Sequence, residues 1–316
     1  MNSRFLTEFH SLCRHLDHRI SLEALLDEYR RGNIADPDRT KEDAAIETHL
    51  ADMTVVWDRL FPQFPAARWK RRTTMWEYNR GQRDEYLQQL LTTHIREEQS
   101  RSRLIVNPAT VFGRHAMSLA RELEDYEVVG TDIDVAPHRL YRLVSSLKYP
   151  RLSNYRFERE NIFDPDLNRR PAAVTFFGAC GVVTDGCIDY AIGIESPLLL
   201  CRSCCHECIG GNTDIVKRPS WMYWGFYGKN LSMKWIERRF AGTGYYFSDR
   251  HRAEAYPRSR AAREIMDSDT MIDVARNSVE SDICRSIIDL DRCLFLQENG
   301  YDVLYREELF FAHKRA

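Results

Sequence analysis

The stretch that decides the fold reads Leu104-Ile-Val-Asn-Pro-Ala-Thr-Val-Phe-Gly-Arg-His-Ala-Met-Ser-Leu-Ala120, and it is followed by Val128-Val-Gly-Thr-Asp-Ile-Asp134. The pattern predicts a buried strand, a tight turn that ends at Gly113, a helix, and a second strand that ends at Asp132. An acid about 20 residues beyond such a turn is where a nucleotide-binding α/β unit places the carboxylate that accepts hydrogen bonds from a ribose. The stretch therefore indicates a site for an adenosine-containing cofactor.

The turn departs from the glycine fingerprint of such units. In a G-x-G-x-G spacing that ends at Gly113, the two earlier positions are Ala109 and Val111. Glycine is used there because the backbone turns sharply and approaches the ligand without a Cβ atom in the way. Alanine is the smaller departure and valine the larger one, so a turn that has lost its ligand is the alternative.

From residue 104 onward, short apolar runs alternate with helical stretches, which predicts an α/β, Rossmann-like, doubly wound and mostly parallel sheet. The expected strands are 104–106, 127–132, 155–158, 173–177, 198–201, 245–248 and 308–313, and the expected helices are 113–124, 138–147, 185–194 and 284–299. Ligands of such sheets bind at the carboxyl ends of the strands. We therefore expect the site at that edge.

The first hundred residues are helical in character. Apolar residues recur at helical spacing among many charges, for example at Ile46, Leu50, Met53 and Trp57. We expect helices at 21–31, 41–60 and 82–101. The predicted domains are a helical region at 1–100 and the sheet domain at 101–316, with an aromatic and basic insertion near 212–260.

Composition narrows the class of protein. The 316 residues include 45 basic and 47 acidic side chains, so overall charge favours neither nucleic acid nor a membrane as partner. No run of 18 apolar residues occurs, and the first residues lack the basic region followed by an apolar region that a signal peptide has. Nine cysteines, an odd number, fit a reducing compartment. We expect a cytoplasmic protein, and these features leave its oligomeric state open.

The order of segments from about 104 to 316 resembles a class I S-adenosylmethionine-dependent methyltransferase. The resemblance implies an enzyme with S-adenosylmethionine as cofactor. It places Asn107, Ala109 and Gly113 at the methionine-binding turn and Asp132 at the ribose hydroxyls. Asn161 and Ile162, after the third strand, stand where the adenine binds, and the Asn161 carbonyl oxygen can accept from the adenine amino group.

A narrower resemblance lies in Phe177-Gly-Ala-Cys-Gly-Val-Val-Thr-Asp185 and Leu200-Cys-Arg-Ser-Cys-Cys-His206. These stretches are similar to a subgroup, several members RNA-directed, whose fourth strand ends in His-Ala-Cys-Gly and whose fifth ends in Pro-Cys-Cys-His. The similarity implies that Gly178 and Cys180 also line the cofactor site, although Gly178 replaces the histidine and Ser203 the proline. An Asp/Asn-Pro-Pro-Tyr motif after the fourth strand is absent, so methylation of a base amino group has no direct support.

Methyl transfer from a sulfonium is an in-line displacement, so alignment of donor and acceptor supplies much of the acceleration. A base matters where the acceptor carries a proton of high pKa. Asp185 and His206 are the catalytic candidates for positioning the acceptor or removing its proton. The alternatives are that Asp185 caps a helix that starts near Gly186 and that His206 closes a turn by hydrogen bonding.

The run Cys201, Cys204, Cys205, His206 and Cys208 has the ligand types of a zinc site. A closed site normally takes a second pair from a distant segment, and only Cys180 or Cys187 offers one. We therefore expect buried thiols and no metal.

Two stretches, 68–83 and 217–239, combine basic side chains with aromatic rings. Such a mixture suits the binding of single-stranded nucleic acid or a lid over a small acceptor. The alternative is that the rings belong to the core and the basic side chains face solvent.

Three interpretations stay open. The first is a methyltransferase that acts on an RNA or a small molecule. The second is a degenerate methyltransferase fold that acts as a scaffold or assembly factor, and the third is a zinc-stabilised binding module.

Overall fold

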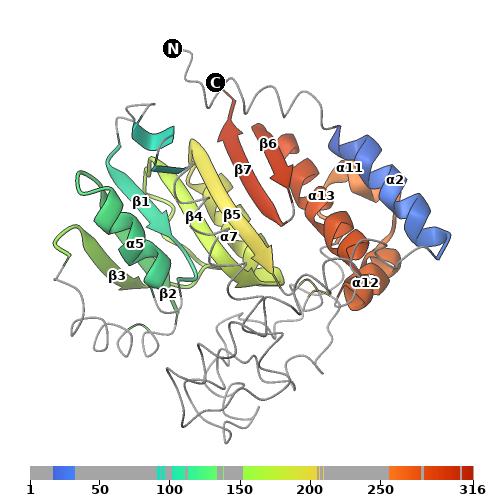
Figure 1. The fold of residues 1–316 in the computed structure, drawn as a ribbon, viewed down its shortest axis with the longest axis horizontal. Coiled ribbons are helices and arrows are strands. Elements are labelled where there is room, and N and C mark those ends of the chain that lie inside the picture. The colour runs from blue at the N-terminus through green and yellow to red at the C-terminus, as the bar shows by residue number, and fades with distance from the viewer. Residues whose placement is uncertain are drawn as a thin grey trace, which may run out of the picture. The chain divides into compact units, whose positions relative to one another are not determined.

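One mixed sheet of seven strands organises the chain, in the order β3-β2-β1-β4-β5-β7-β6 (Figure 1). The computed structural model describes residues 17–32, 91–92, 94–96, 102–110, 113–133, 138, 152–204, 206, 209, 256–278, 281–306 and 308–315. The strands are β1 Leu104–Asn107, β2 Glu127–Asp132, β3 Tyr155–Arg159, β4 Ala173–Cys180, β5 Leu198–Cys204, β6 Tyr301–Arg306 and β7 Leu309–Lys314. Strands β1 to β5 pair in parallel, and β7 runs antiparallel to β5 and β6. The predicted doubly wound, mostly parallel sheet is confirmed.

Helices connect and cover these strands. They are α2 His18–Arg30, α5 Arg114–Glu122, α7 Val182–Gly193, α11 Arg260–Arg263, α12 Ser268–Asn277 and α13 Asp282–Glu298. Side chains start several of them: Asp17 accepts from two backbone N–H groups of α2, and Ser281 accepts from the Cys284 N–H of α13. Helix α7 begins three residues before the predicted 185. Strand β6 and helices α11 and α12 were not predicted from the sequence, and the strand predicted at 245–248 lies outside the described residues.

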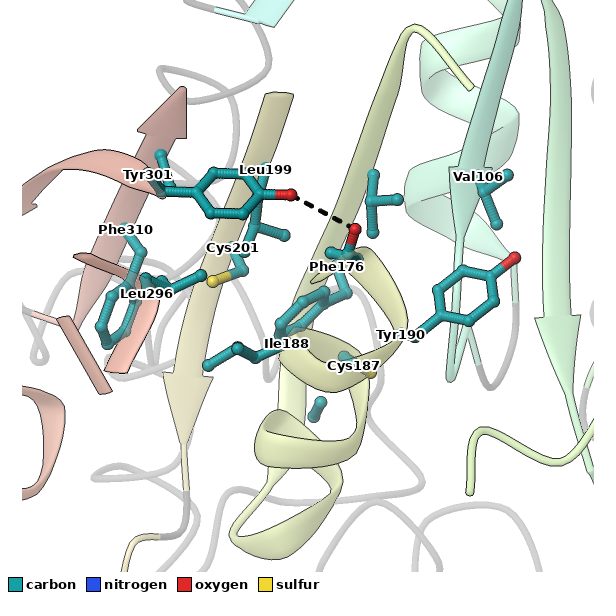
Figure 2. Packing of buried hydrophobic residues seen from close by; sticks show 14 of the residues in the cluster. Val106, Phe176, Cys187, Ile188, Tyr190, Leu199, Cys201, Leu296, Tyr301 and Phe310 are labelled. Carbon is teal, nitrogen blue, oxygen red and sulfur yellow. Dashed lines mark hydrogen bonds between the residues drawn. The ribbon is translucent and has the colours of Figure 1, made fainter. Parts of the chain in front are cut away.

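The main core lies between the sheet and helices α7 and α13. Val106, Phe176 and Leu199 come from three neighbouring strands and are at most 1 % exposed (Figure 2). Tyr301 closes this cluster, because its hydroxyl donates to the Ser196 and Ala191 carbonyl oxygens at 2.8 and 3.3 Å. Alternation along β4 sends Thr175 to the opposite face, where α5 packs.

Helix α2 belongs to the sheet unit. Its Leu22 and Leu26, one turn apart, pack into a second cluster with α12 and α13, and His18 Nε2 lies 3.0 Å from the Val303 carbonyl oxygen of β6. The chain forms two compact units, Met1–Ile34 with Thr92–Ala316, and Ala35–Leu91. The predicted division at residue 100 stays a prediction, and the expected helices at 41–60 and 82–101 lie largely outside the described residues.

Among the helices that the structure describes, none combines the length and the apolar character needed to cross a bilayer.

Candidate functional site

The turn after β1 is fastened to its neighbours by Asn107 and Thr110. The Asn107 amide donates to the Thr175 carbonyl of β4 and accepts from the Thr110 hydroxyl. The Thr110 N–H donates to the Thr131 carbonyl of β2 at 2.9 Å. Asn107, a predicted cofactor contact, is only 2 % exposed. These bonds fix the path of the turn between β2 and β4.

Two of the three fingerprint positions have left-handed backbone. Ala109 has φ 51° and Gly113 has φ 74°. At Gly113 a Cβ atom would lie 2.5 Å from the Tyr155 hydroxyl oxygen and 2.8 Å from His138 Nδ1. Glycine is therefore required there by conformation and by close packing of α5 on β3. Ala109 adopts the conformation that glycine favours, and Val111 lies outside the described residues.

The ends of β2 and β3 meet beside this turn. Asp132 ends β2, is 9 % exposed, and accepts through its backbone oxygen from the Glu160 N–H at 3.1 Å. Asn161 Oδ1 accepts from the Phe163 N–H at 3.1 Å, which closes the loop after β3. Ile162 is 8 % exposed and packs into the main core.

Gly186 of α7 lets the loop after β3 approach the helix. A Cβ atom at Gly186 would lie 2.7 Å from Phe163 Cε1 and 3.4 Å from Ile162 Cγ2. Because the first separation is shorter than real Cβ contacts, the loop would have to move. Gly186 therefore sets where Asn161 and its neighbours lie relative to α7.

The carboxyl end of β4 is irregular. Its register with β5 shifts between Phe177 and Ala179, which places a bulge at Gly178. The backbone of Cys180 lies opposite that of Cys204 in the register of the two strands. Gly181, with φ 51°, is the N-cap of α7. The backbone of the predicted cofactor contacts Gly178 and Cys180 thus lies at the same edge as Asp132. Their roles in cofactor binding stay predictions.

Asp185 does not cap α7, so that alternative was wrong. The N-cap of α7 is Gly181, and Asp185 lies within the first turn. Its carboxylate accepts from Arg292 Nε at 2.8 Å, Arg292 Nη2 at 3.1 Å, Arg258 Nη1 at 3.2 Å and the Tyr256 hydroxyl. Burial favours the neutral acid, but Arg292 and Arg258 outweigh it and hold the Asp185 pKa below its usual value. Proton removal by Asp185 stays a prediction, and its pairing favours a structural role.

Arg292 of α13 joins Asp185 to the end of β5. It is fully buried and donates from Nη1 to Asp289 Oδ1 at 3.0 Å and from Nη2 to the Gly181 carbonyl at 3.0 Å. Asp289 also accepts from the Ser203 hydroxyl at 2.9 Å and lies 2.8 Å from His206 Nε2. We call the following set the Arg292 network: Asp185, Ser203, His206, Tyr256, Arg258, Asp289 and Arg292. It brings the two predicted catalytic residues into one buried cluster.

Sequence reasoning missed Asp289 and Arg292. Both lie within the apolar run of the predicted helix 284–299, and both are fully buried. Charged side chains are almost never fully buried unless they are paired. Charged residues within an otherwise apolar helical segment were the sequence feature that indicated a buried ion pair.

The cysteines whose side chains the structure describes are buried. Cys187, Cys201 and Cys293 are buried free thiols whose pKa values are raised by burial. Cys201 packs in the main core, as expected for a buried thiol. Within the described ranges no group of three His, Cys, Asp or Glu side chains could hold a metal ion. Cys205 and Cys208 lie outside those ranges.

No protein-family model matches the chain, and no curated protein matches it either. Solved structures are similar to it. The SAH-bound methyltransferase from Podospora anserina is 9 % identical, with a TM-score of 0.35 over 74 % of this chain and 78 % of that one. Magnesium protoporphyrin IX methyltransferase from Synechocystis, with bound SAH, is 9 % identical, with a TM-score of 0.35 over 87 % and 100 %. An O-methyltransferase family protein from Burkholderia thailandensis is 12 % identical, with a TM-score of 0.33 over 84 % and 71 %.

Proposed function

We propose that the chain is an S-adenosylmethionine-dependent methyltransferase that acts on an RNA or a small molecule. The observation that carries the proposal is the strand order β3-β2-β1-β4-β5-β7-β6 with β7 antiparallel, which is the order of class I methyltransferases. That order brings the turn after β1 and the loops after β2, β3 and β4 to one edge, where such sheets bind ligands.

The predicted cofactor residues supply the contacts that the proposal requires. Asp132, at the end of β2, would accept from the ribose hydroxyls, and the loop at Asn161 and Ile162 would contact the adenine. The turn from Asn107 to Gly113 and the backbone at Gly178 and Cys180 would hold the methionine part. S-adenosylmethionine supplies an electrophilic methyl group on a sulfonium. The chain's task is to align the acceptor with that group.

Transfer of a radioactive methyl group tests the activity directly. The purified full chain is incubated with S-adenosylmethionine labelled in the methyl group, once with total cellular RNA and once with a protein-free metabolite extract. We expect labelled product in one of the two fractions. Label in neither fraction, with intact protein, would contradict an active methyltransferase and favour the scaffold interpretation.

A further inference from the structure

One nitrogen of His206 has no hydrogen-bond partner in the described part of the chain. The ring is fully buried, and its Nε2 lies 2.8 Å from Asp289 Oδ1. Nδ1 is buried as well and has no hydrogen-bond partner among the residues that the structure describes. Most buried polar atoms in proteins are paired, so an unpaired one calls for an explanation.

The surroundings of His206 decide which nitrogen carries its proton. Burial raises the pKa of Asp289, but the hydrogen bonds from His206 and Ser203 and the charge of Arg292 outweigh it and hold that pKa below its usual value. Asp289 is therefore a carboxylate, which only accepts hydrogen bonds, so the hydrogen of the neutral ring is on Nε2. A hydrogen on Nδ1 would be a buried N–H without an acceptor, which is rare. Nδ1 therefore presents a lone pair.

Asp289 is itself held on several sides. Its Oδ2 accepts from the Ser203 hydroxyl at 2.9 Å and lies 3.4 Å from the Tyr305 hydroxyl. Its Oδ1 accepts from Arg292 Nη1 at 3.0 Å. A carboxylate fixed in this way orients an imidazole and stabilises the imidazolium that forms when the ring takes up a proton. Asp185 does not take this place, because its carboxylate binds Arg292, Arg258 and Tyr256 instead of His206.

We propose that Asp289 and Arg292 are positioning residues that hold His206 with Nδ1 as the proton acceptor, so that the methyl acceptor is a hydroxyl or an amine. The inference rests on the proposed function. As the acceptor oxygen or nitrogen bonds to the methyl carbon, the carbon–sulfur bond breaks and its electron pair stays on sulfur. The acceptor's proton passes to His206 Nδ1 and from there to water. An acceptor without a proton to lose would not need this arrangement.

Nitrogen NMR of the histidine rings tests the positioning without an acceptor. In the full chain labelled with ¹⁵N-histidine, His206→Gln identifies the His206 signals by their loss. We expect wild-type His206 to be the neutral tautomer with hydrogen on Nε2. Asp289→Asn should shift that tautomer, because an amide can also donate. Asp291→Asn is the matched control: Asp291 is fully buried on the same helix but binds Ser259 instead of His206.

A wild-type ring with hydrogen on Nδ1 would overturn the inference, and so would equal shifts in the two variants. The wild-type spectrum alone shows which nitrogen of His206 carries the hydrogen, so it tests the inference even where Asp289→Asn fails to fold.

Methyl transfer to the responsive RNA or metabolite fraction tests the chemical part. We expect Asp289→Asn and His206→Gln to lower kcat about 100-fold or more, with KM for S-adenosylmethionine little changed. Asp291→Asn should stay near wild type. An equal loss in Asp291→Asn, or a raised KM with unchanged kcat, would contradict the proton-acceptor role. Absence of transfer to either fraction would refute the proposed function and that role with it, whereas the NMR result alone decides the tautomer.

Discussion

His115 shows at the scale of one residue how the turn after β1 is supported. It lies in the first turn of α5, with Nε2 3.2 Å from the Thr175 hydroxyl and its ring centre 3.9 Å from that of Phe177. Burial and, to a smaller extent, the charge of Arg202 together lower the His115 pKa to about 3. The ring is therefore neutral at physiological pH and packs the start of α5 onto β4.

This shifted pKa makes the stability of the chain depend on pH. The unfolded His115 takes up a proton below its ordinary pKa of 6.5, whereas the folded one does so only near 3. Above pH 6.5 this group does not change the free energy of unfolding. As the pH falls below 6.5, the free energy of unfolding decreases by up to about 1.4 kcal/mol per pH unit for one such group. His115→Phe should reduce that slope, measured by urea unfolding at pH 7.5, 6.5 and 5.5.

Thr175→Val is the control for this measurement. It removes the hydroxyl partner but keeps the partly buried imidazole, so we expect the slope to persist. An unchanged slope in His115→Phe would show that His115 is not the group responsible.

Among the secondary-structure elements, those that depend on a local sequence pattern were predicted. Apolar runs located β1 to β5 within a few residues, and helical spacing located α13. Strand β6 was missed although Tyr301, Val303 and Tyr305 alternate, because charged and aromatic residues interrupt the apolar signal.

Long-range contacts explain what could not be predicted at the site. Asp289 meets His206 across 83 positions of sequence, and Arg292 meets Asp185 across 107. No local pattern identifies such partners. In the same way, the path of the β1 turn depends on Thr131 and Thr175 of neighbouring strands.

Gly186 and Gly193 offer a matched test of the contact between α7 and the loop after β3. Gly186→Ala places a methyl group against Phe163, whereas Gly193→Ala meets only the tip of the half-exposed Leu167 side chain, 3.0 Å away. Alanine favours a helix over glycine by about 1 kcal/mol, so Gly193→Ala should unfold at the same or a higher temperature. Gly186→Ala should lose about 1–3 kcal/mol through overpacking and bind S-adenosylmethionine more weakly.

Thermal unfolding with and without S-adenosylmethionine measures both effects. Equal behaviour of the two variants would show that the loop after β3 is not constrained by α7.

At the scale of the whole molecule, the fold gathers distant segments at one sheet edge. The turn after β1, Asp132, the loop at Asn161 and the bulge at Gly178 follow four neighbouring strands. Behind β4 and β5, the Arg292 network joins α7, α13 and the segment at Tyr256 and Arg258. In the proposed site the cofactor would lie at this edge, and His206 of the neighbouring Arg292 network would take the proton from the acceptor.

Calorimetric titration of the full chain with S-adenosylmethionine and S-adenosylhomocysteine tests the central claim most directly. Asp132→Ala is the test variant, and Asp125→Ala, an exposed acid in the turn before β2, is its control. We expect both ligands to bind wild type and Asp125→Ala alike, and Asp132→Ala to bind about 1–3 kcal/mol more weakly. No binding of either ligand to folded wild type, or equal affinity of Asp132→Ala, would contradict an adenosyl site at this edge of the sheet.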